Sequence, residues 1–104
     1  MAKVKITVVK RLNTSELFGS NPPAHPSDPT YSPICTKFKE GEEFLADFTC
    51  PPGFCGVAFS DMQKEIEHVF LGGSYPWMKE KGVAVSVCSD GLRPVIFKLE
   101  KVED

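Results

Sequence analysis

The sequence lacks several patterns that identify common kinds of protein. No apolar run approaches the roughly 18 residues that a membrane-spanning helix needs. The first residues, MAKVKITVVKRLN, alternate charged with apolar side chains, whereas a signal peptide has a continuous apolar segment. We therefore expect a cytoplasmic protein with no membrane association, in a compartment where disulfides are uncommon.

An excess of one charge is also missing. The 12 basic and 14 acidic residues give a net charge of −2, whereas a nucleic-acid-binding domain usually has a strongly basic face. No basic cluster is interleaved with aromatic residues, so we expect no nucleic-acid partner. Phosphate-binding glycine loops and a nucleophile elbow are absent too. These absences leave open whether the protein is an enzyme.

The patterns that are present predict a single α+β domain over residues 1–104. Apolar residues alternate over residues 3–11, which predicts a half-buried strand with Val4, Ile6 and Val8 facing the core. Further strands are expected at residues 43–47, 83–88 and 93–102, and the strand at residues 83–88 is expected to be buried. The last two should form a hairpin at Asp90-Gly91, with Val95, Phe97 and Leu99 facing inward.

One principal helix is expected between the second and third of these strands. Ser60 and Gln63 have the spacing of a capping box, and Asp61 and Glu65 would suit the helix dipole. Apolar residues recur at helical spacing, and Gly72-Gly73 should end the helix. The expected core-facing residues are Ala58, Met62, Ile66, Val69 and Phe70.

Residues 13–34 are predicted to form a proline-rich loop insertion. Five prolines lie within residues 18–34, each without an amide donor; they are Pro22, Pro23, Pro26, Pro29 and Pro33. The expected architecture is therefore a small, mainly antiparallel sheet with one principal helix packed on it. Because the edges of such a sheet are exposed or paired between copies, a homo-oligomer is an expected assembly.

The four cysteines carry most of the chemical information. Cys35 follows the proline-rich loop, Cys50 and Cys55 flank a Pro-Pro-Gly turn, and Cys88 ends a strand. All four lie at loops or element ends, where sites usually form. The C-x4-C spacing of Cys50 and Cys55 differs from the C-x2-C spacing of zinc ribbons. Three interpretations stay open: thiolate ligands of a metal ion or iron–sulfur cluster, a redox pair of thiols, and small buried side chains without chemistry.

Three other residues are candidates to border a site of this kind. Asp90 could act as an acid or base, although turn formation explains it fully. Arg93 could clamp an anion or form a surface salt bridge. Trp77, the single tryptophan, could line a pocket or interface or cover the core.

Five segments of the chain carry a family resemblance when they are taken together. They are KVKITVVKR, FKEGEEF, GFC, GGSYPWMKEKG and CSDGLRPVIFKLEKVED. Their combination resembles an uncharacterised family of small proteins of about this length, found mainly in anaerobic bacteria and archaea. The resemblance implies recurrent thiols at Cys35, Cys55 and Cys88, with Cys50 as a local addition, and favours an oxygen-sensitive site. It implies no reaction.

The leading hypothesis from the sequence is a small metal- or iron–sulfur-binding protein with a redox or metal-handling role. Its expected ligands are Cys35, Cys55 and Cys88, with Cys50 as a further candidate, and its expected cofactor is an iron–sulfur cluster or zinc. The first alternative is a metal-free oligomeric binding module that uses the Tyr-Pro-Trp loop and a sheet edge. The second is a thiol-based redox enzyme that uses Cys55.

Overall fold

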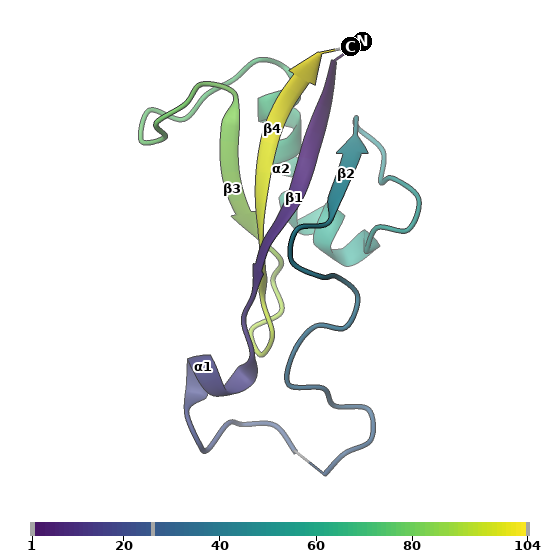
Figure 1. Cartoon of the computed structure of the whole chain (residues 1–104), viewed down its shortest axis with the longest axis vertical. Helices are drawn as coiled ribbons and strands as arrows, with labels where there is room; N and C mark the ends of the chain where they lie inside the picture. Colours follow the sequence, from purple (N-terminus) through teal and green to yellow (C-terminus); the bar gives the residue numbers. More distant parts are fainter. Residues whose placement is uncertain (1, 26, 104) are drawn as a thin grey trace.

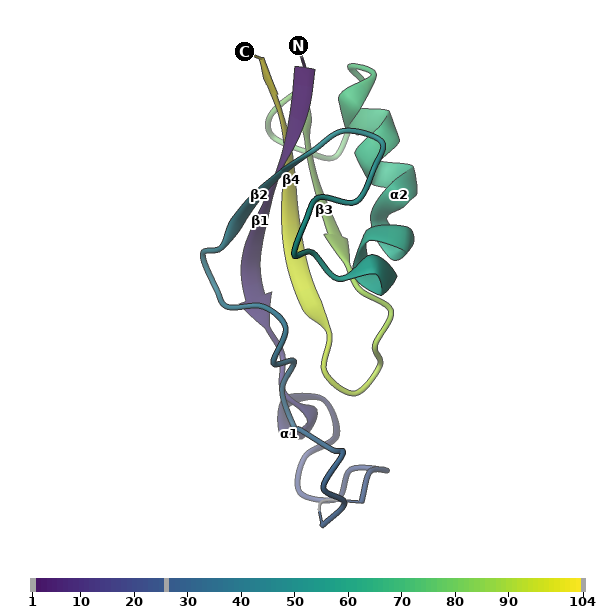
Figure 2. The ribbon, with the colours of Figure 1, turned by 90° about the vertical axis from the view of Figure 1, so that its right-hand side faces the viewer.

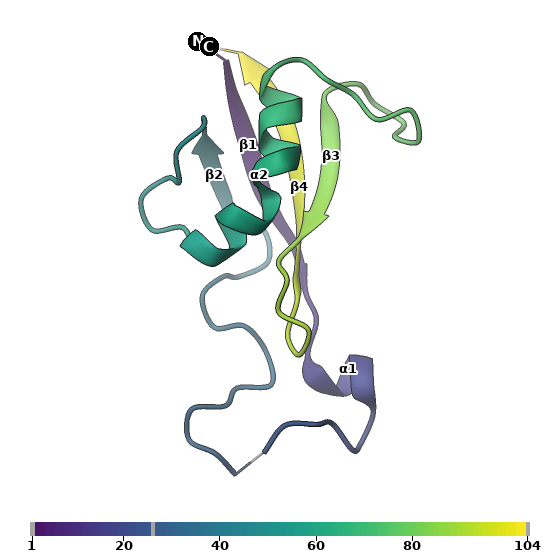
Figure 3. The ribbon, with the colours of Figure 1, turned by 180° about the vertical axis from the view of Figure 1, so that it is seen from behind.

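The structure, a computed structural model, describes residues 2–25 and 27–103. Its elements are β1 (Ala2–Arg11), α1 (Thr14–Phe18), β2 (Glu43–Ala46), α2 (Gly56–Phe70), β3 (Val83–Val87) and β4 (Val95–Glu103). The strands form one antiparallel sheet in the order β2-β1-β4-β3, and α2 covers one face of it (Figures 1 and 3). The predicted α+β architecture is confirmed.

The hydrophobic core lies between the sheet and α2 (Figure 2). The alternating apolar residues of β1 and β4 face the core as predicted. Val4, Ile6, Phe97 and Leu99 are fully buried. Helix α2 contributes Ala58, Met62, Ile66 and Val69 as predicted, and Phe70 packs at the margin. A cluster of phenylalanines from outside the sheet completes the core: Phe38, Phe54 and Phe59.

Helix α2 begins earlier than predicted. Its N-cap is Cys55, so the capping box at Ser60 and Gln63 is wrong and Ser60 lies inside the helix. The start is set by the preceding turn, in which the Phe54 N–H donates to the Pro51 carbonyl at 3.2 Å. Gly53 has a φ of +80° there, which a type II turn requires at its third position.

The earlier start also changes the electrostatics of the helix. The first turn of α2 contains no acidic residue, so the predicted compensation of the dipole by Asp61 and Glu65 is wrong. Asp61 instead accepts a hydrogen bond from the Ser89 N–H at 2.8 Å. The positive end of the helix dipole is therefore not neutralised by its own first turn.

Strand β3 is an edge strand and not the buried strand that its valines suggested. Val83 and Ala84 are buried, but Val85 and Val87 are 54% and 44% exposed. β3 pairs with β4, which confirms the predicted hairpin. Helix α2 covers the opposite face of the sheet, and the 74–82 loop lies beside the unpaired edge of β3.

Residues 13–34, here called the arm, project from the end of the sheet (Figure 2). The radius of gyration, 15.0 Å, exceeds the roughly 13 Å of a compact domain of this length. The arm is less irregular than predicted, because α1 occupies its start with a capping box between Asn13 and Glu16. Of the five prolines, Pro26 lies outside the described residues.

Within the described ranges, no helix has the length and apolar character needed to cross a bilayer. Helix α2, with 15 residues, is shorter than the roughly 20 that span the hydrocarbon core.

Candidate functional site

A cavity of about 240 Å³ lies where the start of α2, the segment after the arm and the β3–β4 connection meet. Three cysteines, Cys35, Cys55 and Cys88, line it together with Asp90 and Arg93. The remaining lining residues are Phe38, Val57, Ala58 and Val95. The fold thus brings five of the seven residues singled out from the sequence to one place, from segments 53 positions apart between the first and last cysteine.

Cys55 occupies the N-cap of α2, and its side chain makes no capping hydrogen bond. Its carbonyl accepts the first helical bond, from the Phe59 N–H at 3.0 Å. The first N–H groups of an α-helix have no partner within the helix and favour negative charge. A thiolate at Cys55 would therefore lie in a favourable electrostatic position.

Cys88 lies directly after β3 and is held by a reciprocal contact with the start of β4. The Cys88 N–H donates to the Val95 carbonyl at 3.1 Å, and the Val95 N–H donates to Cys88 Sγ at 3.3 Å. Hydrogen bonds of this kind to sulfur orient a cysteine and stabilise charge on it.

Cys35 is positioned through its backbone. The Arg11 guanidinium donates from Nη1 to the Cys35 carbonyl at 3.0 Å, and Arg11 is held in turn by Glu40, with Nε and Oε1 3.1 Å apart. Arg11 therefore fixes the chain where it returns from the arm to the cavity. Within the alternating residues 3–11 no local pattern indicates this role of Arg11.

Asp90 and Arg93 form an ion pair at the cavity, with Arg93 Nε and Asp90 Oδ2 3.0 Å apart. Burial raises the pKa of Asp90, but hydrogen bonds from the Leu92 N–H and from Arg93 outweigh it, so the pKa lies below its ordinary value of 3.8. Arg93 also donates from Nη1 to the Ser32 carbonyl at 3.2 Å. The ion pair therefore holds the loop between β3 and β4 against the arm.

Replacing Asp90 with asparagine should lower the stability near pH 7 by less than about 1 kcal/mol. The amide can still accept the Leu92 N–H, so the main loss is the charge pair with Arg93. Because the folded pKa is depressed, the carboxylate stabilises the fold above its unfolded pKa, and this contribution disappears as the pH falls through the folded pKa.

Urea unfolding of both proteins as a function of pH measures this difference. The difference in the free energy of unfolding between wild type and Asp90→Asn should be constant above about pH 5. It should disappear below pH 3.8. A difference that widens in acid would contradict the assignment.

The other two residues singled out from the sequence lie elsewhere. Cys50 is exposed, and its Sγ lies 3.7 Å from the Pro51 carbonyl and 3.8 Å from the Phe54 carbonyl. Trp77 lies on the 74–82 loop beside β3, stacked on Tyr75 with ring centroids 4.9 Å apart. Neither residue lines the cavity that contains Cys35, Cys55 and Cys88, here called the thiol cavity.

The four cysteines are free thiols. Among the described residues, no three side chains of histidine, cysteine, aspartate or glutamate are already arranged to hold a metal ion. Binding of a metal ion by the three cavity cysteines would therefore require their sulfurs to move from the positions that they have here.

Comparison of the chain with known proteins finds no matching family model, no matching curated protein and no matching solved structure. The family resemblance described above therefore stays an expectation, and the case for a site depends on the cavity itself.

Proposed function

We propose that the thiol cavity binds a thiophilic metal ion or an iron–sulfur cluster through Cys35, Cys55 and Cys88. The observation that supports this proposal is that three cysteines from three separate segments line one cavity. Soft thiolate ligands select zinc, copper(I) and iron–sulfur centres. The exposed Cys50 is outside the proposed ligand set.

The surroundings of the three cysteines suit this role electrostatically. Three thiolates concentrate negative charge, which needs nearby donors and positive charge. The start of α2 lies at Cys55, and the Val95 N–H donates to Cys88 Sγ. Arg93 lines the same cavity, where it is paired with Asp90. N–H donors to sulfur and nearby charge are the groups that tune metal–thiolate centres.

Three protein ligands would leave one coordination position open. A metal site with an open position can bind a substrate or a partner, whereas a closed four-ligand site is usually structural. Four further lining residues are apolar, namely Phe38, Val57, Ala58 and Val95, and two are charged, Asp90 and Arg93. We therefore propose a redox or metal-handling role, with Asp90 and Arg93 beside the open position.

Elemental analysis with acid-labile sulfide, on protein purified without oxygen or chelator, tests the proposal. We expect about one metal ion or cluster per chain. Each of the single changes Cys35→Ser, Cys55→Ser and Cys88→Ser should lower the metal content per chain about tenfold or more. The reason is that hard hydroxyl oxygens bind these metals poorly. Cys50→Ser is the matched control and should retain the wild-type content.

Metal-free wild-type protein, or an unchanged metal content in Cys55→Ser, would show that the proposal is wrong. In the metal-free case, the rate of thiol alkylation separates the two alternatives. Fast alkylation of Cys55 near neutral pH would indicate a thiol enzyme. Ordinary rates at all four cysteines would leave a binding module.

A further inference from the structure

The open edge of β3 has hydrogen-bonding groups directed away from the sheet. The Lys101 N–H donates to the Gly82 carbonyl at 3.0 Å, and the Cys88 N–H donates to the Val95 carbonyl at 3.1 Å. In an antiparallel pair, alternate residues direct their backbone groups toward the same neighbour. The even-numbered residues of β3 therefore bond to β4, and Val83, Val85 and Val87 direct their N–H and C=O groups outward.

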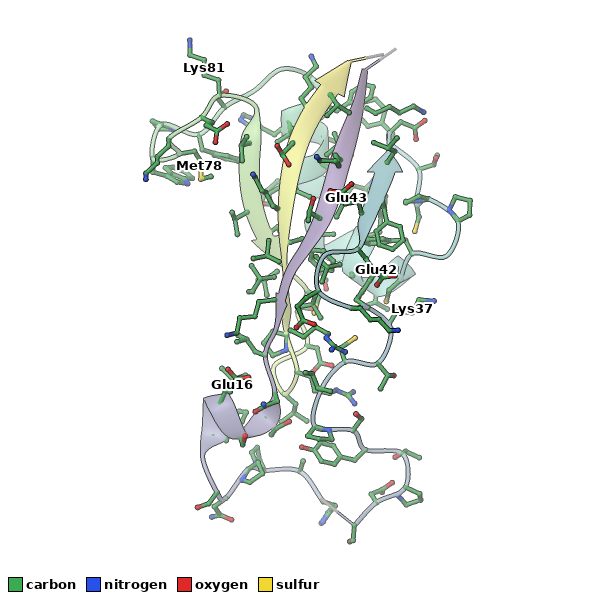
Figure 4. The ribbon with its side chains drawn as sticks, viewed as in Figure 1. Glu16, Lys37, Glu42, Glu43, Met78 and Lys81 are labelled. Carbon is green, nitrogen blue, oxygen red and sulfur yellow. The ribbon has the colours of Figure 1, made fainter. Side chains whose placement is uncertain are left out.

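The two edge strands, β3 and β2, differ in how well their side chains discourage pairing with a strand of another molecule. β3 reads VAVSV, without charge or proline. β2, at the other edge, has four residues and carries Glu43, whose carboxylate lies 3.8 Å from Lys5 Nζ. Figure 4 shows Glu43 between β2 and β1, and Met78 beside β3 on the opposite side of the sheet. Charged side chains discourage strand pairing between molecules, so β3 is the unprotected edge.

Two hollows flank this edge, one on each face of the sheet. The hollow on the α2 side measures about 460 Å³, and the hollow on the outer face measures about 410 Å³. Trp77, Met78 and Val85 line both, and the Trp77 side chain is 75% exposed. Successive side chains of a strand point to opposite faces, so a strand added at β3 would direct its side chains alternately into the two hollows.

We propose that β3 pairs antiparallel with β3 of a second copy of this chain, about a two-fold axis through Val85. The edge of β3 is self-complementary. The backbone N–H and C=O groups of the three outward valines in one copy can bond to those of the same three valines in the other. Such isologous pairing is the commonest arrangement in homodimers. This interface is independent of the thiol cavity and of the function proposed for it.

The charges around the edge are compatible with a second copy. The α2-side hollow carries Lys64 and Glu65, with Nζ and Oε2 3.2 Å apart. The outer hollow carries Lys79, Glu80 and Lys98. Each hollow thus presents both signs of charge, so lysines of one copy can pair with glutamates of the other. Pairing would also cover Val85, Val87 and the indole of Trp77.

Sedimentation velocity of the full chain over a range of concentrations tests the proposal. We expect a monomer–dimer equilibrium, and Val85→Lys should weaken it about 30-fold or more, because two like charges would face each other across the axis. Leu45→Lys is the matched control, since Leu45 is 56% exposed on the protected edge strand. That variant should dimerise as the wild type does.

The fluorescence of Trp77, the single tryptophan, provides a second readout. Its emission should shift to the blue as the wild-type concentration rises, and should not shift in Val85→Lys. Circular dichroism verifies that both variants fold, which we expect because both positions are exposed. A monomer at every concentration, or a dimer that survives Val85→Lys, would overturn the proposal. Loss of the dimer in Leu45→Lys would also overturn it.

Discussion

Replacing Phe97 with alanine is expected to lower the free energy of unfolding by about 3–5 kcal/mol, the range for phenylalanine truncation in a packed core. Phe97 is fully buried in β4. Its ring centroid lies 5.2 Å from that of Phe38 in an edge-to-face arrangement and 5.7 Å from that of Phe54. Truncation would remove both aromatic contacts and leave a cavity between the sheet and α2.

Phe18→Ala is the matched control for this prediction. Phe18 ends α1 on the arm and is 44% exposed, so its truncation should change stability by about 0.5 kcal/mol or less. Urea unfolding followed by circular dichroism measures both variants. Equal losses in the two would contradict the position of the core between the sheet and α2.

Replacing Thr14 with valine is expected to loosen the arm, at a cost of about 1–3 kcal/mol for buried groups left without a partner. Thr14 is the buried polar residue at the start of α1, 1% exposed. Its Oγ1 lies 3.0 Å from the Leu92 carbonyl and 3.3 Å from the Pro33 carbonyl. The Thr14 N–H also donates to the Pro33 carbonyl, at 2.9 Å, and valine keeps that bond. The hydroxyl therefore connects the start of the arm to the β3–β4 connection, and valine keeps its shape without its donor.

Hydrogen exchange and limited proteolysis of residues 19–34 measure this loosening. Exchange and cleavage should both be faster in Thr14→Val and close to wild type in Thr14→Ser, which keeps the hydroxyl. Because Cys35 follows the arm directly, Thr14→Val should also weaken metal binding under the proposed function. Unchanged protection of the arm would show that Thr14 does not fasten it.

Local periodicity predicted most of the fold. The alternation in β1 and β4 identified their buried sides, because in a strand the side-chain direction depends only on the parity of the position. The helical spacing in α2 identified Met62, Ile66 and Val69, because residues three and four positions apart lie on one face of a helix. The start of α2 was predicted wrongly because Ser60 matches a capping pattern, while the turn at Gly53 and the burial of Phe59 place the helix start earlier.

Of two further features that differ from the prediction, one had a signal in the sequence and the other had none. Asn13 and Glu16 have the spacing of a capping box, which predicts the start of α1 at the entrance of the arm. The five prolines that follow favour irregular structure, and the predicted loop included residues 13–18 with them. The exposure of Val85 and Val87 had no such signal, because a strand at an edge and a strand inside a sheet can have the same apolar sequence.

The sequence by itself determined the strands, the principal helix and the apolar sides that they bury, since these depend on neighbours a few positions apart. Only the tertiary structure decided which thiols share a cavity and which edge of the sheet is open. Cys50 and Cys55 are close in sequence, yet Cys55 lies beside Cys35 and Cys88 in the cavity lining and Cys50 is exposed. The reason is that these outcomes depend on strand order and on the return of the chain from the arm, both set by long-range packing.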